Sequence, residues 1–178
     1  MTHEEAVPLL RPIGYTQGEV WADLGAGQGR FTLALADLLG EGGVVHAIDK
    51  NKRDLQTLEP SQPSFASVRV LERDFTKPLG LDELDGILMA NSLHYVRNQV
   101  RLLGQLMLQI KEGGKLVIIE YETRRANPWI PFPVSFKRLE ELAAKVGLPA
   151  PQQVHTRASS FGRKMYVAVI TIPHTLRD

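Results

Sequence analysis

Short apolar stretches alternate along this chain with segments in which apolar residues recur every three or four positions. Residues 84–90 (LDGILMA) are typical of a buried strand, whereas Phe31, Leu35 and Leu38 share one face of a helix. This alternation predicts an α/β fold around a mainly parallel sheet with helices on both faces. The strands that we expect are residues 19–24, 44–49, 66–71, 84–90, 115–121, 152–156 and 165–172.

Helix start and stop signals lie between these strands. Thr2 and Glu5 have the spacing of a capping box and predict a short first helix before Pro12. Gly40 is placed to end one helix, and Ser135 is placed to begin another. After the first helix, we expect helices over residues 31–39, 51–58, 98–111 and 136–146, with Gly113-Gly114 ending the third of these.

Two connections constrain the topology further. Only about a dozen residues join the third and fourth strands, so the crossover helix between them must be short or missing. No helix-length segment separates the last two strands. They are therefore expected to form an antiparallel hairpin at the edge of the sheet.

A glycine-rich turn, DLGAGQG at residues 23–29, follows the first strand. A turn between strand and helix directs backbone N–H groups and the positive helix end toward a ligand. The dinucleotide fingerprint requires a third glycine at position 30, where this chain has Arg30, which disfavours a nicotinamide oxidoreductase. Asp23, just before the glycines, would repel a pyrophosphate but would favour a ligand with ammonium and sulfonium charges.

This motif resembles the first motif of the class I S-adenosylmethionine-dependent methyltransferases, an acidic residue followed by G-x-G-x-G. Three further segments follow in that family's order: a strand ending in Asp49, ERDF at 72–75 and NSLHYV at 91–96. The resemblance covers roughly residues 18–121 and is strongest with the family's small-molecule branch. It implies a Rossmann-like, doubly wound, mainly parallel seven-stranded sheet with an antiparallel C-terminal edge strand.

The resemblance also implies an enzyme that transfers a methyl group from S-adenosylmethionine to an O, N or C atom of a small, apolar or aromatic acceptor. Asp49 would hold the ribose, Asp74 the adenine amine, and Phe75 a face of the adenine ring, with the stem of Lys50 on the other face. Asn91 would border the methionine part through its backbone. The expected cofactor-binding residues are Asp23, Gly25, Ala26, Gly27, Gly29, Asp49, Lys50, Asp74, Phe75 and Asn91.

Each of these residues also has a simpler structural interpretation. The glycines could form only a tight turn, Asp49 could cap the helix that follows it, and Asp74 could make a turn. The order and spacing of the whole set favour the cofactor interpretation.

His94 is the residue that we expect to act as a general base, with Tyr95 as a second catalytic candidate. His94 titrates near neutrality and follows the fourth strand, at the edge expected to hold the sulfonium. The alternative interpretation is that His94 only forms part of a cavity wall or of a turn. Glu120 and Tyr121 are weaker candidates, because polar residues at strand ends often bond only to backbone.

The segment NPWIPFP at 127–133 follows the fifth strand, on the edge that should face the acceptor. Trp129 and Phe132, held by three prolines, are expected to form a rigid apolar wall for the substrate. The alternative is a loop that seals the core before the next helix.

The chain has 178 residues, for which we expect one domain. Residues 1–17 would be a cap helix, 18–121 the cofactor-binding core, and 122–178 an acceptor-side loop, helix and hairpin. The sequence has no cysteine and no histidine–carboxylate cluster with metal-ligand spacing, so we expect no metal site. It has neither a run of roughly 20 apolar residues nor a signal peptide, so we expect no membrane span and a cytoplasmic location.

Charge is distributed unevenly. Residues 1–123 contain 12 Lys and Arg against 17 Asp and Glu, whereas residues 124–178 contain 9 against 3. The basic last third leaves RNA or protein methylation open, although aromatic residues are not interleaved with the basic ones as in strand-binding surfaces. A binding or scaffold protein without catalysis is a further alternative, and a homodimer is possible.

Overall fold

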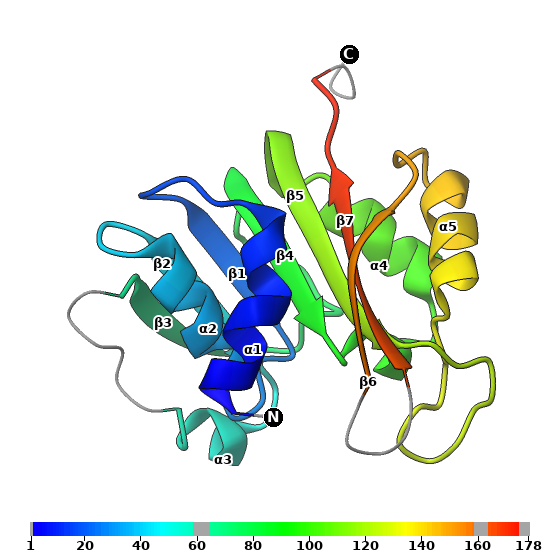
Figure 1. Ribbon diagram of the computed structural model, residues 1–178, viewed down its shortest axis with the longest axis horizontal. Coiled ribbons are helices and arrows are strands. Elements are labelled where there is room, and N and C mark those ends of the chain that lie inside the picture. Colours follow the sequence, from blue (N-terminus) through cyan, green and yellow to red (C-terminus); the bar gives the residue numbers. More distant parts are fainter. Residues whose placement is uncertain (1, 59–64, 159–163, 175–178) are drawn as a thin grey trace.

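The computed structural model describes residues 2–58, 65–158 and 164–174. Seven strands form one sheet in the order β3-β2-β1-β4-β5-β7-β6 (Figure 1), which confirms the predicted seven-stranded fold. The first five strands pair in parallel, and β7 is antiparallel to both of its neighbours. The strands are β1 (Val20–Leu24), β2 (Val44–Asp49), β3 (Ser67–Glu72), β4 (Leu84–Ala90), β5 (Ile110–Tyr121), β6 (Gln152–Ala158) and β7 (Lys164–Thr171).

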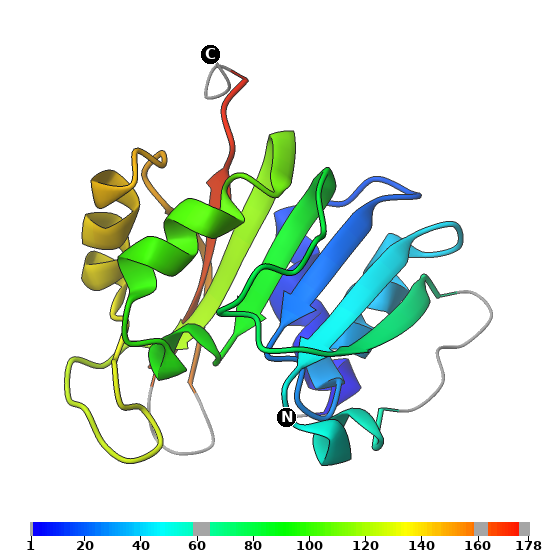
Figure 2. The same cartoon turned by 180° about the vertical axis from the view of Figure 1, so that it is seen from behind.

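Helices cover both faces of the sheet, as predicted. α1 and α2 pack together on one face, and α4 and α5 contribute to the hydrophobic cluster on the other (Figures 1 and 2). None of the described helices is both long enough and apolar enough to cross a bilayer. The α-helices are α1 (His3–Leu10), α2 (Arg30–Leu39), α3 (Lys52–Leu55), α4 (Gln99–Leu106) and α5 (Phe136–Lys145), and the 3-10 helices are η1 (Arg11–Ile13) and η2 (Leu93–Tyr95).

The helix ends follow the capping signals of the sequence. The Thr2 hydroxyl accepts a hydrogen bond from the Glu5 N–H, and a Glu5 carboxylate oxygen accepts one from the Thr2 N–H, which completes the capping box of α1. Ser135 caps α5 by accepting from the Arg138 N–H, and Gly40 ends α2 with a positive φ. α3 covers only part of the predicted helix at 51–58.

The predicted helix over residues 98–111 is too long. α4 ends at Leu106, and β5 already begins at Ile110. Gly113 and Gly114 lie inside β5, where they exchange backbone hydrogen bonds with Ile172. The apolar positions at 107 and 110 continue the helical spacing, but sheet pairing determines the backbone there, with a register shift opposite Leu84 and Gly86.

No helix lies between β3 and β4, as the short connection predicts. Residues 73–83 form an irregular connection, seen in Figure 2 to cross the sheet. Leu79 and Leu81 of this segment pack on the core in place of a helix. The neighbouring strands carry polar residues in this region, where His46 of β2 pairs with Arg69 of β3.

The strand order reverses between β1 and β4, which are parallel neighbours. Crossovers from these two strands lead in opposite directions, so a crevice forms beyond their carboxyl ends, where α/β proteins bind ligands. Leu24 and Ala90 end the two strands. The glycine turn and the segment around His94 therefore meet at one place.

Candidate functional site

The glycine turn after β1 has a conformation that glycine alone adopts easily. Gly25, Gly27 and Gly29 have φ values of 82°, 53° and 78°. The Gly25 and Ala26 N–H groups donate to the Ile48 carbonyl oxygen at 2.8 and 3.0 Å. A Cβ atom on Gly25 would lie 2.5 Å from the Cβ of Ser92. Any side chain at this position would therefore collide with the segment after β4.

Asp23 lies beneath this turn and is 1% exposed. The Thr32 hydroxyl of α2 donates to its Oδ2 atom at 2.6 Å. Burial, with a smaller contribution from the charge of Asp49, raises the pKa of Asp23 to about 7, although the Thr32 hydrogen bond opposes the shift. A cationic group in the adjoining space would stabilise the ionised carboxylate.

Asp49 connects the end of β2 to the glycine turn. Its Oδ2 atom accepts from the Gly27 N–H at 2.9 Å, and its Oδ1 atom accepts from the Asn51 N–H at 2.8 Å. Asn51, not Asp49, is the N-cap of α3. The carboxylate therefore positions the turn and is not needed as a helix cap.

Asp74 and Phe75 begin the irregular connection after β3. Asp74 is exposed, and its Oδ1 atom accepts from the Thr76 N–H and hydroxyl, which lower its pKa. Lys50 is also exposed, and its charge contributes to that lowering. Phe75 is half-buried against Gly25, with its ring 3.4 Å from the position of a Cβ there.

A cavity of about 540 Å³ opens beside the glycine turn, and we call it the cofactor-side cavity. Its wall includes Asp23 and the glycine turn on one side and Asn91 on the other. Glu5 of α1 and Arg157 of β6 also line it. Arg157 donates to the Glu5 carboxylate at 2.6 Å and to the Glu5 carbonyl oxygen at 3.1 Å, so this pair joins α1 to β6 at the cavity.

A second cavity, of about 620 Å³, lies beyond the carboxyl ends of β4 and β5, and we call it the acceptor-side cavity. Asn91 and Tyr121 line both cavities. His94, Tyr95 and Trp129 line the acceptor-side cavity together with the residues Asn127 and Ile130. The two cavities therefore adjoin along a common wall.

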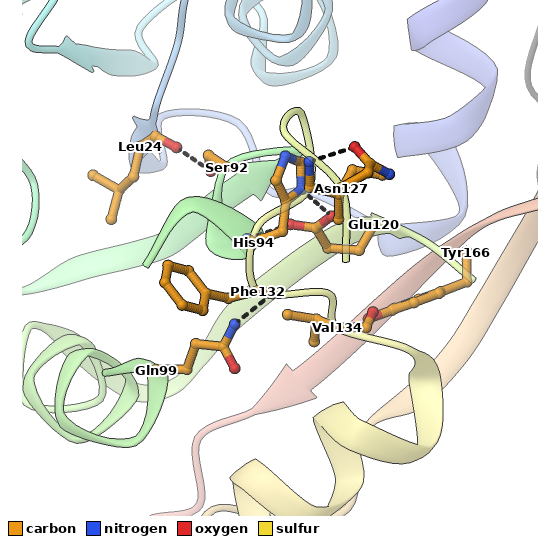
Figure 3. Close-up of polar contacts among 10 residues, drawn as sticks. Leu24, Ser92, His94, Gln99, Glu120, Asn127, Phe132, Val134 and Tyr166 are labelled. Carbon is orange, nitrogen blue, oxygen red and sulfur yellow. Dashed lines mark hydrogen bonds and ion pairs between the residues drawn. The ribbon is translucent and has the colours of Figure 1, made fainter. Parts of the chain in front are cut away.

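His94 forms a buried pair with Glu120, the last residue but one of β5 (Figure 3). Its Nδ1 atom is 2.6 Å from the Glu120 Oε2 atom, and its backbone N–H donates to Oε1 at 3.1 Å. The two side chains are 3% and 1% exposed. A carboxylate in this place orients the imidazole ring.

Comparison with known proteins identifies this architecture. The sequence pattern of a protein family described as "Methyltransferase domain" matches residues 16–163. The chain belongs to this methyltransferase family. The match includes the residues that line both cavities, except for Glu5 and Met165 of the cofactor-side cavity.

Individual relatives are more distant. Demethylmenaquinone methyltransferase of Bacillus licheniformis is 26% identical over 105 residues, which are 58% of this chain and 45% of the relative. The chain thus spans about half the length of the curated relative that it matches.

Solved structures agree on the fold. A SAM-dependent methyltransferase from Aquifex aeolicus superposes with a TM-score of 0.72 at 22% identity, over 94% of this chain and 89% of the other. The 1,6-didemethyltoxoflavin-N1-methyltransferase of Burkholderia thailandensis, solved with its acceptor and S-adenosylhomocysteine, gives 0.71 at 19% identity, over 96% and 78%. At these identities the likeness shows the fold alone.

The site residues that the sequence predicts fall into three groups. Asp23, Gly25, Ala26, Gly27 and Asn91 line the cofactor-side cavity, and His94, Tyr95 and Trp129 line the acceptor-side cavity. Gly29, Asp49, Lys50, Asp74 and Phe75 lie around the glycine turn or beyond β2 and β3, outside both linings.

Phe132 does not line either cavity. Its N–H donates to the His94 carbonyl oxygen at 3.0 Å, and its own carbonyl oxygen accepts from the Gln99 side chain at 2.9 Å. Phe132 therefore anchors the proline-rich segment to η2 and α4 (Figure 3). A substrate role for Phe132 stays a prediction from the sequence.

Some residues of the site had no signal in the sequence analysis. Glu5 and Arg157 are 152 positions apart and meet only through the placement of β6. Thr32 follows the glycine turn by one helical turn, a spacing that could have paired it with Asp23. In the described ranges, no three His, Asp or Glu side chains gather so as to hold a metal ion.

Proposed function

We propose that this methyltransferase transfers a methyl group from S-adenosylmethionine to a small-molecule acceptor. The observation that carries the proposal is the common wall of Asn91 and Tyr121 between a cavity beside the glycine turn and an aromatic cavity beside His94. Because the two cavities share these lining residues, a ligand bound in one would lie next to a ligand bound in the other. Displacement of water and fixed orientation supply much of the acceleration that methyl transfer needs.

The residues present fit S-adenosylmethionine. A Cβ on Gly25 would close the turn against Ser92, and Asp23 offers a buried carboxylate to a cationic ligand. We assign Asp49 to the ribose hydroxyls, Asp74 to the adenine amine, and Phe75 with the stem of Lys50 to the faces of the ring. When bound, the cofactor supplies an electrophilic methyl group on a sulfonium whose neutral thioether is a good leaving group.

The acceptor would lie among Tyr95, Tyr121 and Trp129. His94 would take a proton from the acceptor where methylation requires its loss. The Tyr95 ring packs at a tilt against His94, with ring centroids 4.3 Å apart, and forms a further part of the wall of the same space. A cytoplasmic location and a homodimer remain predictions from the sequence.

Calorimetric titration with S-adenosylmethionine, S-adenosylhomocysteine and NAD tests the cofactor assignment. The two adenosyl ligands should bind and NAD should not. Release of S-adenosylhomocysteine on a panel of small aromatic acceptors, RNA and protein then tests the reaction. Binding of NAD without S-adenosylmethionine would overturn the proposal, and cofactor binding without turnover on any acceptor would favour the binding-protein alternative.

Gly25→Ala should weaken S-adenosylmethionine binding at least about tenfold, because the added methyl group meets Ser92 and moves the turn. Gly18→Ala is the matched control, since Gly18 has a similar φ of 86° but nothing within 4 Å of its Cβ position. Both substitutions carry backbone strain of about 1–3 kcal/mol, and only the first should affect the ligand. Equal loss of affinity in both variants would contradict the assignment of the turn.

A further inference from the structure

We propose that Glu120 holds His94 with its Nε2 atom available to the acceptor, and that the acceptor is a neutral, planar molecule methylated on a phenol-type hydroxyl. This inference rests on the proposed function and specifies its acceptor. It assigns Glu120 as a positioning residue, which acts through His94 and does not line the acceptor-side cavity.

The hydrogen bonds determine which nitrogen of His94 carries a proton. Glu120 approaches both the Nδ1 atom and the backbone N–H of His94, and an ionised carboxylate can only accept. A proton therefore resides on Nδ1 of the neutral ring. No hydrogen bond from another described residue reaches Nε2, which keeps its lone pair beside the acceptor-side cavity.

Charge compensation makes this pair a proton acceptor. Glu120 is 1% exposed, and a buried carboxylate is costly unless a positive partner can form next to it. When Nε2 takes a proton, His94 becomes an imidazolium in contact with that carboxylate. The other titratable residues beside the pair are Tyr95 and Tyr121, whose rings lie near the His94 ring, and Tyr166, which interacts electrostatically with Glu120; all three are neutral when protonated.

The lining of the acceptor-side cavity indicates what binds there. Among the described residues, the lining contains no Asp, Glu, Lys or Arg side chain. Tyr95, Tyr121 and Trp129 provide aromatic rings, and Asn91 and Asn127 provide amides. An acceptor with a carboxylate, phosphate or ammonium group would have no counter-ion in this lining, whereas a neutral planar ring can stack on its aromatic side chains.

The base favours a hydroxyl over an amine as the nucleophile. A neutral amine already has a lone pair for attack, but a neutral phenol is a weak nucleophile until its proton begins to leave. In the proposed step the acceptor O–H bond breaks and its proton moves to Nε2 of His94. The oxygen electron pair forms the bond to the methyl carbon, and the electron pair of the broken carbon–sulfur bond stays on sulfur.

A purely structural role for Glu120 is the competing interpretation, because its hydrogen bond to the His94 backbone could hold only η2. Nitrogen NMR of the resting protein separates the two. We expect the neutral His94 ring to be protonated at Nδ1 in the wild-type protein and at Nε2 in Glu120→Gln, since the amide can donate to Nδ1. A wild-type ring protonated at Nε2 would overturn the proposal even if the variant failed to fold.

Kinetics provide the second readout. With naphthol as the probe acceptor, Glu120→Gln should lower kcat by about a hundredfold, leave KM for S-adenosylmethionine unchanged and alter the pH profile of kcat. Glu122→Gln is the matched control two positions along, because Glu122 accepts from the Phe136 N–H away from both cavities, and it should keep wild-type kcat. An unchanged kcat and pH profile in Glu120→Gln would reject the positioning role.

Acceptor class is tested with naphthol, naphthylamine and naphthoate, which share one ring system. Only naphthol should be methylated efficiently. Preference for the amine or the carboxylate would overturn the inferred acceptor while leaving the proposed function intact. If no naphthalene acceptor is methylated but another small molecule is, the planar-phenol inference fails, and if nothing is methylated the proposed function itself fails.

Discussion

Asp23 shows how a single residue links the stability of this protein to its ligand. Its carboxyl group is buried beside the cofactor-side cavity, with the Thr32 hydroxyl 2.6 Å away as its hydrogen-bond donor. Without a cationic partner, burial favours the protonated form, and the pKa rises to about 7 from the ordinary value of 3.8. A bound ammonium group would reverse this preference.

The free energy of unfolding should therefore depend on pH in a defined direction. The folded protein holds the Asp23 proton up to about pH 7, whereas the unfolded chain releases it near pH 4, so Asp23 contributes stability at low pH that is lost as pH rises between these values. The shift corresponds to at most about 4 kcal/mol. Urea denaturation across this pH range should show that the free energy of unfolding declines as pH rises, and that this decline is smaller in Asp23→Asn.

Asp82→Asn is the control for this measurement, because Asp82 is an exposed aspartate outside both cavities. It should leave the pH dependence of the wild-type protein intact. A decline of equal size in Asp23→Asn and in the wild type would show that other groups produce it. Adding S-adenosylmethionine should reduce the decline in the wild type and in Asp82→Asn, but not in Asp23→Asn.

At the scale of elements, the proline-rich segment between β5 and α5 carries a side chain with little structural role. Trp129 is 76% exposed and lines the acceptor-side cavity, while the segment is anchored through Asn127 and Phe132. Trp129→Ala should therefore leave the melting temperature nearly unchanged and raise KM for an aromatic acceptor about tenfold. The assay is steady-state kinetics with calorimetric melting of the same samples.

Leu108→Ala serves as its control, since Leu108 is a comparably exposed apolar residue, at 68%, outside both cavities. Leu108→Ala should change neither the melting temperature nor KM for the aromatic acceptor. If Trp129→Ala lowers the melting temperature but not the acceptor affinity, the segment seals the core and does not bind substrate.

Elements also show what the sequence could and could not predict. The boundaries of β2 and β4 were predictable because apolar runs between turn residues leave few alternatives for a buried strand. The start of β5 was not predictable, because Ile110 continues the helical spacing of α4. The strand conformation there is set by the pairing of Ile110 with Leu84 and by the hydrogen bonds of Gly113 and Gly114 with Ile172. Local periodicity cannot report such long-range hydrogen bonds.

The same limit applies to the site. Adjacent residues such as Asp23 and the glycines could be associated because the motif places them in one turn. The pairs His94 with Glu120 and Glu5 with Arg157 join different elements, and nothing local marks them. Phe132 illustrates a different limit, because an aromatic residue beside prolines predicts a binding wall, whereas the hydrogen bonds that fix its position are made by its backbone.

At the scale of the whole molecule, α1 and β6 are joined across the cofactor-side cavity by Glu5 and Arg157. The two side chains are about two-fifths and one-third exposed, so solvent screening should keep their contribution to global stability small. Arg157→Gln should therefore fold normally but release S-adenosylmethionine several-fold faster, because it frees one wall of the cavity. Stopped-flow displacement measures this rate.

Arg138→Gln is the matched control for Arg157→Gln. It removes the exposed ion pair with Glu141 on α5, outside both cavities, and should leave the release rate unchanged. Equal rates in Arg157→Gln and the wild type would show that the ion pair does not retain the ligand.

The link between Glu5 and Arg157 also bears on the order of folding. A contact between residues 152 positions apart forms only after the intervening chain is largely in place, because closing so long a loop costs entropy early. We therefore expect the cofactor-side cavity to be completed late in folding, when the hairpin of β6 and β7 docks beside β5. Amides of α1 and β6 should gain hydrogen-exchange protection together when the cofactor binds, as a single cooperative unit.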